Sequence, residues 1–263
     1  MLDMIIKGGR VVTPSGAGDW DVGVAGEKIV AVAMPGLLPS EGATTIDATG
    51  RIVVPGGIEP HTHAAANVRP GARELVSGIP NAGPLEHSLG AIWGGTTTVI
   101  DFAPVPNEGD LAEGILDFIS VWKGNAYTDY STHCIYSNGS TPDAISRYSE
   151  LITAGLPSIK IFTTDIRPPE GRVSTLTPIA KIDSGRLEDV MSQIARHGGV
   201  LAVHGEDDEL VMYNYLLAKQ RGQWDWHNAH LIHSKTVEDL AFRSVLRLAE
   251  RTGAGLYFVH VTA

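Results

Sequence analysis

From Pro55 onward the chain repeats one pattern, in which a short apolar run is followed by a segment with apolar residues at helical spacing. This alternation is typical of parallel β/α units, because a helical crossover returns the chain to the same end of a parallel sheet. The pattern therefore predicts an α/β fold, namely a TIM-type (β/α)8 barrel of which about six units are present, rather than an open sheet. The expected strands are 57–63, 97–103, 132–136, 158–162, 200–204 and 256–261.

The segments between these runs predict the helices of the barrel. Thr141 is suited to cap the N-terminus of one helix, and Gly155 is suited to end it. Six strands would leave two unpaired sheet edges and an open core, so we expect the barrel to be incomplete at its C-terminus. The expected helices are 88–93, 111–122, 141–154, 186–197, 209–219 and 237–251.

Residues 1–54 follow a different pattern, with short strand-like runs, glycine-containing turns and no helical periodicity. A hairpin is expected at Gly26-Glu27-Lys28. The chain is therefore expected to divide into a small β module at 1–54 and a barrel at 55–263.

The composition restricts the class of protein. A formal net charge of −10 argues against a protein that binds a nucleic-acid backbone, because such proteins gather Lys and Arg on one face. Cys134 is the single cysteine, which excludes an intrachain disulfide and a thiolate zinc cluster, and its apolar neighbours predict a core position. No signal-like N-terminus and no run of about 18 apolar residues is present, so we expect a cytoplasmic protein that does not enter a membrane.

Side chains able to bind metals lie at the ends of the predicted strands. They are His61 and His63 on the first strand, Lys160 on the fourth, His204 on the fifth and His260 on the sixth. Active sites of such barrels lie at this end of the strands, and a spacing of two would direct His61 and His63 to one side of their strand. Core histidines and a lysine that reaches solvent are the structural alternatives. The combination and its order favour a metal site.

Lys160 suggests a site for two cations. A buried lysine readily loses its proton, and the neutral amine can react with carbon dioxide to form a carbamate. The carbamate oxygens can bridge two cations about 3.5–4 Å apart, which would activate a hydroxide and polarise a carbonyl group.

The pattern resembles the amidohydrolase superfamily and, within it, the cyclic-amide hydrolases known as D-hydantoinases and dihydropyrimidinases. The resemblance spans essentially the whole chain and corresponds to the N-terminal part of the family's length. In that family the N-terminal β module is half of a β-sandwich. The matching motifs are Pro55-Gly56-Gly57-Ile58-Glu59-Pro60-His61-Thr62-His63, Gly94-Gly95-Thr96-Thr97-Thr98-Val99-Ile100-Asp101-Phe102, Ile159-Lys160-Ile161-Phe162, Val203-His204-Gly205-Glu206 and Phe258-Val259-His260-Val261-Thr262.

The resemblance implies a hydrolase that opens a cyclic amide, ureide or imide ring by attack of a hydroxide held between two divalent metals, with zinc as the expected metal. His61 and His63 would bind the more buried metal, His204 and His260 the more exposed one, and carbamylated Lys160 would bridge them. The family's catalytic aspartate follows the eighth strand, beyond residue 263, so no catalytic residue is assigned and the chain alone is expected to be inactive. The resemblance also implies a homo-oligomer, which is a tetramer in the family.

One position departs from the family pattern. Asp165 lies five residues after Lys160, where hydantoinases carry a tyrosine that helps to stabilise the oxyanion. An acidic group there would repel a developing oxyanion, which predicts an altered substrate or a polar donor from Thr163 or Thr164. Thr163, Thr164 and Asp165 are therefore the candidate substrate-binding residues. The run 64–66 is all alanine where dihydroorotases place an arginine, which argues against that branch.

The remaining polar residues are interpreted as structural or peripheral. Asp101 is expected to support the fold, and the acidic run 206–209 is expected to form the first turn of the helix that follows it. His133 is expected at the start of a strand, away from the site. The other histidines are expected at the surface (His87, His197) or near the barrel mouth, where they could contact substrate or a neighbouring subunit (His227, His230, His233).

Two alternatives stay open. A relative that has lost its metals could keep the barrel as an assembly scaffold, although such relatives usually lose the histidine ligands. The chain could also be one half of a split amidohydrolase, in which a second chain supplies the C-terminal part and the aspartate.

Overall fold

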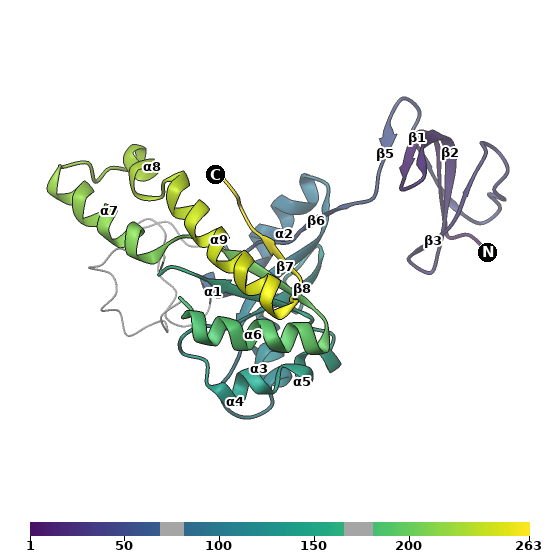
Figure 1. Ribbon diagram of the computed structural model, residues 1–263. Helices are drawn as coiled ribbons and strands as arrows, with labels where there is room; N and C mark the ends of the chain where they lie inside the picture. The colour runs from purple at the N-terminus through teal and green to yellow at the C-terminus, as the bar shows by residue number, and fades with distance from the viewer. Residues whose placement is uncertain (69–81, 166–180) are drawn as a thin grey trace. The chain divides into compact units, whose positions relative to one another are not determined.

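The computed structural model describes residues 1–68, 82–165 and 181–263. These residues form two compact units, Met1–Gly57 and Ile58–Ala263 (Figure 1). None of the helices in these ranges is long and apolar enough to cross a membrane.

The first unit is a sheet of five strands in the order β3-β2-β1-β4, with β5 also paired to β1. β1, β2 and β3 are joined as antiparallel hairpins, whereas β4 and β5 run parallel to β1. The expected hairpin turn is confirmed, because Gly26 and Glu27 have φ values of 56° and 65°, which a two-residue turn between twisted strands requires. The strands are β1 (Met4–Thr13), β2 (Gly16–Ala25), β3 (Lys28–Ala33), β4 (Thr44–Asp47) and β5 (Ile52–Val53).

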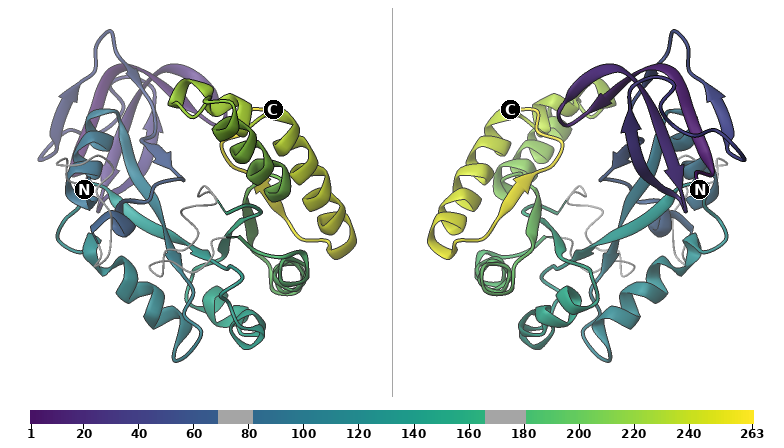
Figure 2. Two further views of the ribbon diagram at one scale, coloured as in Figure 1. Left: turned by 90° about the vertical axis from the view of Figure 1, so that its left-hand side faces the viewer. Right: turned by 90° about the vertical axis from the view of Figure 1, so that its right-hand side faces the viewer.

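The second unit contains a six-stranded sheet in the order β11-β10-β9-β8-β7-β6, and the pairings from β7 to β11 are parallel. Its neighbours follow the order of the chain, as repeated β/α units predict. The views in Figure 2 show the sheet curling, with the helices following one another along its outer side. The strands are β6 (Gly57–Glu59), β7 (Thr96–Pro104), β8 (Asp129–Ile135), β9 (Ser158–Phe162), β10 (Val200–His204) and β11 (Leu256–Phe258).

Helices connect these strands. The α-helices are α1 (Ala64–Val68), α2 (Pro84–Trp93), α3 (Leu111–Phe118), α4 (Pro142–Ser146), α5 (Tyr148–Thr153), α6 (Ser184–His197), α7 (Asp208–Gln220), α8 (Ala229–Ile232) and α9 (Lys235–Thr252). The described residues also include the short 3₁₀ helices η1 (Ile119–Trp122) and η3 (Trp226–Asn228).

Strand alternation divides the curled sheet into an outer and an inner face. Ile159 and Ile161 of β9 are fully buried in the apolar core that the sheet forms with its helices, whereas Lys160 between them belongs to the other face. Ile115 of α3 and Ile194 of α6 complete this core from the helical side. Each such side chain contributes about 1.5–3 kcal/mol through burial. The apolar core between the outer face of the sheet and the helices thus holds the strands in place. The inner face, which carries Lys160, does not contribute to that core.

The expected strands at 57–63 and 256–261 are shorter than predicted. β6 ends at Glu59 because the next residue, Pro60, has no N–H group with which to continue the ladder. β11 ends at Phe258, and His260 adopts a left-handed conformation with φ of 37° that is incompatible with an extended strand.

The expected helix at 141–154 is divided into α4 and α5. Arg147, between them, has a ψ of 12°, and its guanidinium group donates to the carbonyl oxygen of Gly109. The capping prediction is confirmed, because the Thr141 Oγ1 atom accepts the N–H of Ala144 at 3.2 Å.

Candidate metal centre

The side chains predicted to bind metals all lie at the carboxyl end of the curled sheet. His61 and His63 follow β6, Lys160 is in β9, His204 ends β10, and His260 follows β11. The prediction that His61 and His63 share one face of a strand is wrong, because β6 ends before both. They lie instead in the turn that leads into α1.

The four imidazole rings form a continuous series of contacts. The ring centroids of His63 and His61 are 5.5 Å apart, and those of His61 and His260 are 5.1 Å apart. The centroids of His260 and His204 are 4.6 Å apart. β6 and β11 are the two opposite edges of the sheet. The curl of the sheet therefore brings the residues that follow both edges into contact.

Lys160 lies between two phenylalanine rings, each of which is next to one histidine of this series. Its Nζ atom is 5.0 Å from the ring centroid of Phe102 and 4.8 Å from that of Phe162. The Phe102 ring lies 4.4 Å from His63, and the Phe162 ring lies 5.3 Å from His204. The lysine is fully buried, and in the part of the chain that the structure describes its Nζ atom has no hydrogen-bond partner. Burial lowers the pKa of this amine to about 7.

Electrostatics keep the neighbouring histidines neutral. Burial, with a smaller contribution from the positive charge of Lys160, lowers the pKa of His61 to about 3 and that of His63 to about 4. His63 retains some exposed surface, but the protein atoms around its ring displace enough water to disfavour the charged form. Burial also lowers the pKa of His260. Neutral imidazole is the form that binds metals.

Within residues 1–68, 82–165 and 181–263, no three His, Cys, Asp or Glu side chains are grouped closely enough to hold a metal ion. The histidine rings are thus neighbours without forming a coordination shell. The chemistry of the residues nevertheless suits divalent cations, because neutral imidazoles lie near a buried amine that has no hydrogen-bond partner among the described residues.

Asp101 supports the turn that carries the first two histidines. Its carboxylate is fully buried and accepts the N–H groups of Ala65 and Phe102 and the Nε1–H of Trp122, each at 2.7 Å. Burial raises the pKa of this carboxyl group, while the three hydrogen bonds oppose the rise. The structural interpretation of Asp101 is confirmed, because its partners tie α1 and η1 to β7.

The expectation that His133 lies away from the site is wrong. β8 begins earlier than predicted, at Asp129, because this segment pairs with β7, and His133 is therefore inside the strand. Its Nε2 atom lies 2.9 Å from the carbonyl oxygen of Pro60, and its Nδ1 atom lies 2.7 Å from the Oγ of Ser158. His133 thus ties the residue before His61 to β9 and has no ring nitrogen left for a metal.

The three candidate substrate-binding residues follow β9 and are all engaged with the segment after β10. Thr163 Oγ1 donates to the carbonyl oxygen of Glu206 at 2.8 Å and accepts its N–H at 2.7 Å. Thr164 Oγ1 and the N–H of Asp165 both donate to Asp208 Oδ1 at 3.0 Å. Asp165 is 2% exposed. These contacts fix the loop after Lys160 to the start of α7.

The interpretation of the acidic run 206–209 as one helical turn is correct only for its later members. Asp207 caps α7 by accepting the N–H of Leu210, and Asp208 forms an ion pair with Lys181 at 2.8 Å. Glu206 precedes the helix and is nearly buried. The sequence signal for Glu206 was its position two residues after the candidate ligand His204. The interpretation of the whole acidic run as the first turn of a helix did not use that spacing.

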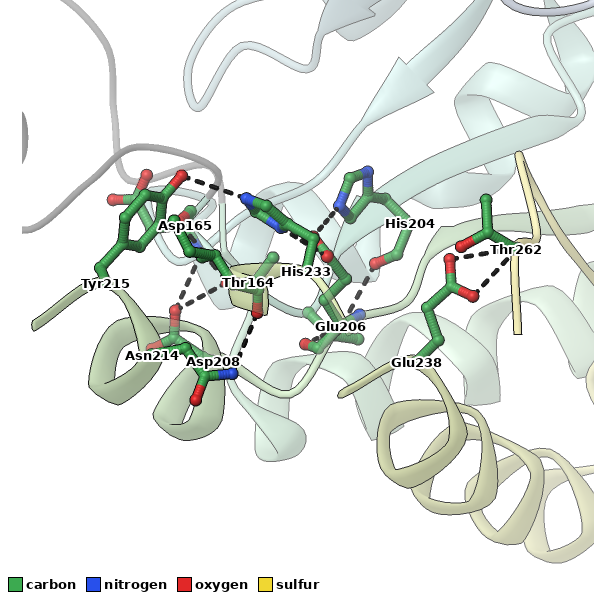
Figure 3. A network of polar contacts seen from close by, with 12 residues as sticks. Thr164, Asp165, His204, Glu206, Asp208, Asn214, Tyr215, His233, Glu238 and Thr262 are labelled. Atoms are coloured by element: carbon green, nitrogen blue, oxygen red, sulfur yellow. Dashed lines mark hydrogen bonds and ion pairs between the residues drawn. The ribbon is translucent and has the colours of Figure 1, made fainter. Parts of the chain in front are cut away.

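Glu206 links two histidines. One carboxylate oxygen lies 2.8 Å from His204 Nε2 and the other lies 2.7 Å from His233 Nδ1, as Figure 3 shows. Burial alone would raise the pKa of the Glu206 carboxyl group, but the hydrogen bonds from these two histidines outweigh it and hold that pKa at about 2.

A second buried glutamate, Glu238 of α9, holds the segment that follows His260. Its carboxylate accepts the N–H group of Thr262 at 3.0 Å (Figure 3) and also that of Ala263. The sequence pattern did not identify this residue, because a glutamate on a helix is usually exposed.

The other histidines lie in different surroundings. His197 is exposed, as expected, and so are His227 and His230. His87 is only partly exposed, contrary to expectation, because its Nδ1 atom lies 3.5 Å from the Oγ1 of Thr62, between the first two candidate ligands. His233 belongs to the Glu206 network described above.

No family model matches the chain. A D-hydantoinase from Streptomyces coelicolor is 29% identical over 98% of this chain and 52% of its own length. A crystal structure of D-hydantoinase superposes with a TM-score of 0.82 at 27% identity, covering 99% of this chain and 52% of that one. The dihydropyrimidinase from Brevibacillus agri gives a TM-score of 0.81 at 25% identity, covering 98% and 52%.

The chain spans about half the length of the curated relatives that it matches. Over nearly all of its own residues, however, the similarity in sequence and the similarity in fold point to the same group of proteins. By both criteria, the chain is similar to D-hydantoinases and dihydropyrimidinases over about half of their length.

Proposed function

We propose that this chain is the metal-binding part of a metal-dependent hydrolase that opens the ring of a cyclic amide, ureide or imide. The observation that carries the proposal is the surroundings of Lys160, a fully buried amine without a hydrogen-bond partner among the described residues. Four histidines from three strand ends form the ring series beside it. Burying a charged group without a partner costs folding free energy. The burial of Lys160 therefore requires a chemical explanation.

Carbamylation of Lys160 gives that explanation. The carbon of carbon dioxide would bond to Nζ, the nitrogen would lose a proton to solvent, and two oxygen donors would result. His61 and His63 would hold one cation, His204 and His260 would hold the other, and the carbamate would bridge them. Bound there, two divalent cations, zinc foremost, would supply Lewis-acid activation of water and of the amide carbonyl.

The chain's own residues would prepare this site in three ways. Phe102 and Phe162 exclude water from the lysine and restrict its movement. Asp101 holds the turn that carries His61 and His63, and Thr163 joins the end of β9 to the segment that follows His204. The geometry of the donors would therefore be set by the sheet and its carboxyl-end loops.

The substrate is proposed only as a chemical class. The relatives are named as D-hydantoinase and dihydropyrimidinase, which supports a cyclic amide with a ring nitrogen next to the carbonyl group. Asp165 stands where the resemblance expects a tyrosine, so we propose a ring other than the simple hydantoin or dihydrouracil. Thr163 and Thr164 have their hydroxyl groups engaged with Glu206 and Asp208. The N–H group of Thr163 is also engaged, because it donates to the carbonyl oxygen of His204 at 3.0 Å. The backbone of Thr164 remains a candidate for contact with the ring.

We also propose that residues 55–263 belong to an eight-stranded barrel and that residues 1–54 belong to a β-sandwich. Large apolar side chains on the first unit support the sandwich, because Ile29 is 65% exposed and Ile52 is 70% exposed. A second sheet packed on them would remove this surface from water. Assembly into a homo-oligomer stays a prediction.

The test of the proposal is metal content together with a direct assay for the carbamate. Zinc-loaded protein grown with ¹³C-labelled bicarbonate should bind two metals per chain and give one carbamate carbon signal. Lys160→Arg should lose that signal and most of the metal, whereas Lys235→Arg, an exposed control, should keep both. A wild-type chain that binds no metal, or a carbamate signal that survives Lys160→Arg, would contradict the proposal.

One observation favours a second candidate, the metal-free assembly scaffold. The described histidines are neighbours but do not form a three-donor group. The scaffold predicts less than one metal per chain under all loading conditions, so the same measurement separates the two. The comparisons give no support to a second chain that would complete a split enzyme.

A further inference from the structure

Behind His204 the structure contains a relay of hydrogen bonds that extends away from the candidate metal centre. One carboxylate oxygen of Glu206 lies 2.8 Å from Nε2 of His204, and the other lies 2.7 Å from Nδ1 of His233. The remaining ring nitrogen of His233, Nε2, lies 3.1 Å from the hydroxyl oxygen of Tyr215. Figure 3 shows the four side chains in this order.

The chemistry of a carboxylate decides where the protons of this relay lie. An ionised carboxylate only accepts hydrogen bonds, so both His204 Nε2 and His233 Nδ1 must carry hydrogen. In neutral His233 the free lone pair is then on Nε2, which accepts the hydroxyl proton of Tyr215. In neutral His204 the free lone pair is on Nδ1. The relay therefore selects one of the two tautomers of His204.

The members of the relay are held by contacts of their own. Thr163 Oγ1 accepts the N–H of Glu206 at 2.7 Å and fixes the glutamate to the end of β9. Asn214 of α7 donates to the carbonyl oxygen of Ile232 at 3.0 Å, which ties the helix that carries Tyr215 to the residue before His233. Glu206 is 7% exposed, so little water competes for its oxygens. The relay is thus held in place by contacts within the protein.

We infer that Glu206, supported by His233 and Tyr215, is a positioning residue that holds His204 in the Nε2-protonated tautomer and so presents its Nδ1 atom to the metal. This inference rests on the function proposed above. Carboxylates that orient metal-binding histidines in this way typically change metal affinity by about 10- to 100-fold when they are removed. Glu206, His233 and Tyr215 thus act through His204 and are not metal ligands themselves.

The tautomer can be measured without any metal. In full-length chain labelled with ¹⁵N-histidine, at a pH well above the ordinary histidine pKa, the ring nitrogen shifts of His204 should report protonated Nε2 and unprotonated Nδ1. His204→Asn identifies the signals. In Glu206→Gln the amide can accept from only one ring and donates toward the other, so the tautomer of His204 or of His233 should change. Protonated Nδ1 in wild-type His204 would overturn the inference.

Metal affinity is the second measurement. Glu206→Gln should weaken the binding of one of two zinc equivalents by about 10- to 100-fold and leave the other within about twofold. Glu209→Gln removes the same charge three residues later, at an exposed position, and should leave both unchanged. Equal binding by wild type and Glu206→Gln would overturn the inference. Failure of the wild type to bind zinc would instead overturn the proposed function, and the tautomer would still be decided by the spectra.

A milder variant covers the case in which Glu206→Gln does not fold. Tyr215→Phe removes only the outer donor, and Tyr213→Phe on the same helix removes an exposed hydroxyl group. Tyr215→Phe should leave Nδ1 of His233 protonated, because Glu206 still accepts from it, but should shift the ¹⁵N signal of His233 Nε2, which loses its donor. It should also weaken the same zinc equivalent by a few fold, whereas Tyr213→Phe should do neither. Identical spectra and affinities for these two variants would count against the relay.

Discussion

At the scale of single residues, two buried polar groups on opposite faces of the sheet have different surroundings, Asp101 on the outer face and Lys160 on the inner face. Asp101 is fully buried and has three donors, one of them a tryptophan ring, so its charge is solvated by the protein. Lys160 is equally buried, yet its Nζ atom has only aromatic rings near it in the described structure. The contacts of Asp101 within the fold therefore explain its burial, whereas among the described residues Lys160 has no such partner, which is why we propose a carbamate there.

Trp122→Phe tests the role of Asp101. The substitution removes the indole donor at 2.7 Å and leaves a buried carboxylate with one hydrogen bond fewer. We expect the free energy of unfolding in urea to fall by about 2–3 kcal/mol, because hydrogen bonds to buried charges contribute about that much. Trp93→Phe is the control, since Trp93 is 84% exposed and should change stability by less than about 0.5 kcal/mol. Equal effects of the two substitutions would contradict this role.

At the scale of the elements, aspartates mark where the helices of the second unit begin. Asp110, Asp183 and Asp207 are the N-cap residues of α3, α6 and α7, and each side chain accepts a backbone N–H three residues later. The cap satisfies one of the free donors of the first turn and places negative charge at the positive end of the helix. These residues explain why α6 starts at Ser184, two residues before the predicted Arg186.

Asp183 makes a pH-dependent contribution to stability. The N–H of Arg186 is the main cause that lowers the pKa of its carboxyl group, and the Arg186 side chain adds to it. A carboxyl group whose pKa is lower in the folded state stabilises the fold above its unfolded pKa, about 3.9, and loses this contribution as the pH falls through the folded pKa.

Asp183→Ala should therefore reduce the free energy of unfolding by about 0.5–2 kcal/mol at neutral pH, and the difference from wild type should shrink in acid. Asp183→Asn keeps a capping side chain without the charge, so it should cost less and its own stability should not follow this titration. Urea unfolding at a series of pH values measures both. A deficit of Asp183→Ala that stays constant into acid would rule out the charged cap.

At the scale of the whole second unit, the curl of the sheet creates the candidate centre. β6 and β11 lie at opposite edges of a six-stranded sheet, yet the rings of His61 and His260 are 5.1 Å apart. Cations held by residues from both edges would close this end of the sheet as a cross-link does. Metal binding should then stabilise the unit as a whole rather than one loop.

Zinc should raise the melting temperature of the wild type, and a chelator should reverse the change. At a free zinc concentration of 100 times the dissociation constant, one site adds about 2.7 kcal/mol. His61→Asn should lose much of this stabilisation, whereas His227→Asn should keep it, since the side chain of His227 is 77% exposed and outside the ring series. Equal shifts for both variants would show that zinc acts elsewhere.

The sequence by itself determined the order of strands and helices in the second unit and the choice of candidate ligands, although several element bounds differed. Apolar periodicity gave β9 and β10 their observed bounds, and His61, His63, His204, His260 and Lys160 were all identified from their positions near strand ends. Such patterns are local, because strand alternation and helix spacing depend on residues near each other in the chain. The comparisons with known proteins then agreed with the family that these motifs resemble.

Only the tertiary structure decided which polar groups meet across the sheet. His133 reaches Pro60 over a distance of 73 residues in the chain, and Glu206 reaches His233 over 27 residues. No periodicity encodes such contacts, because they depend on how far the sheet curls and on where Pro60 ends β6. The physical reason is that strands are specified by neighbouring residues, whereas the partner of a buried charge is specified by the packing of the whole unit.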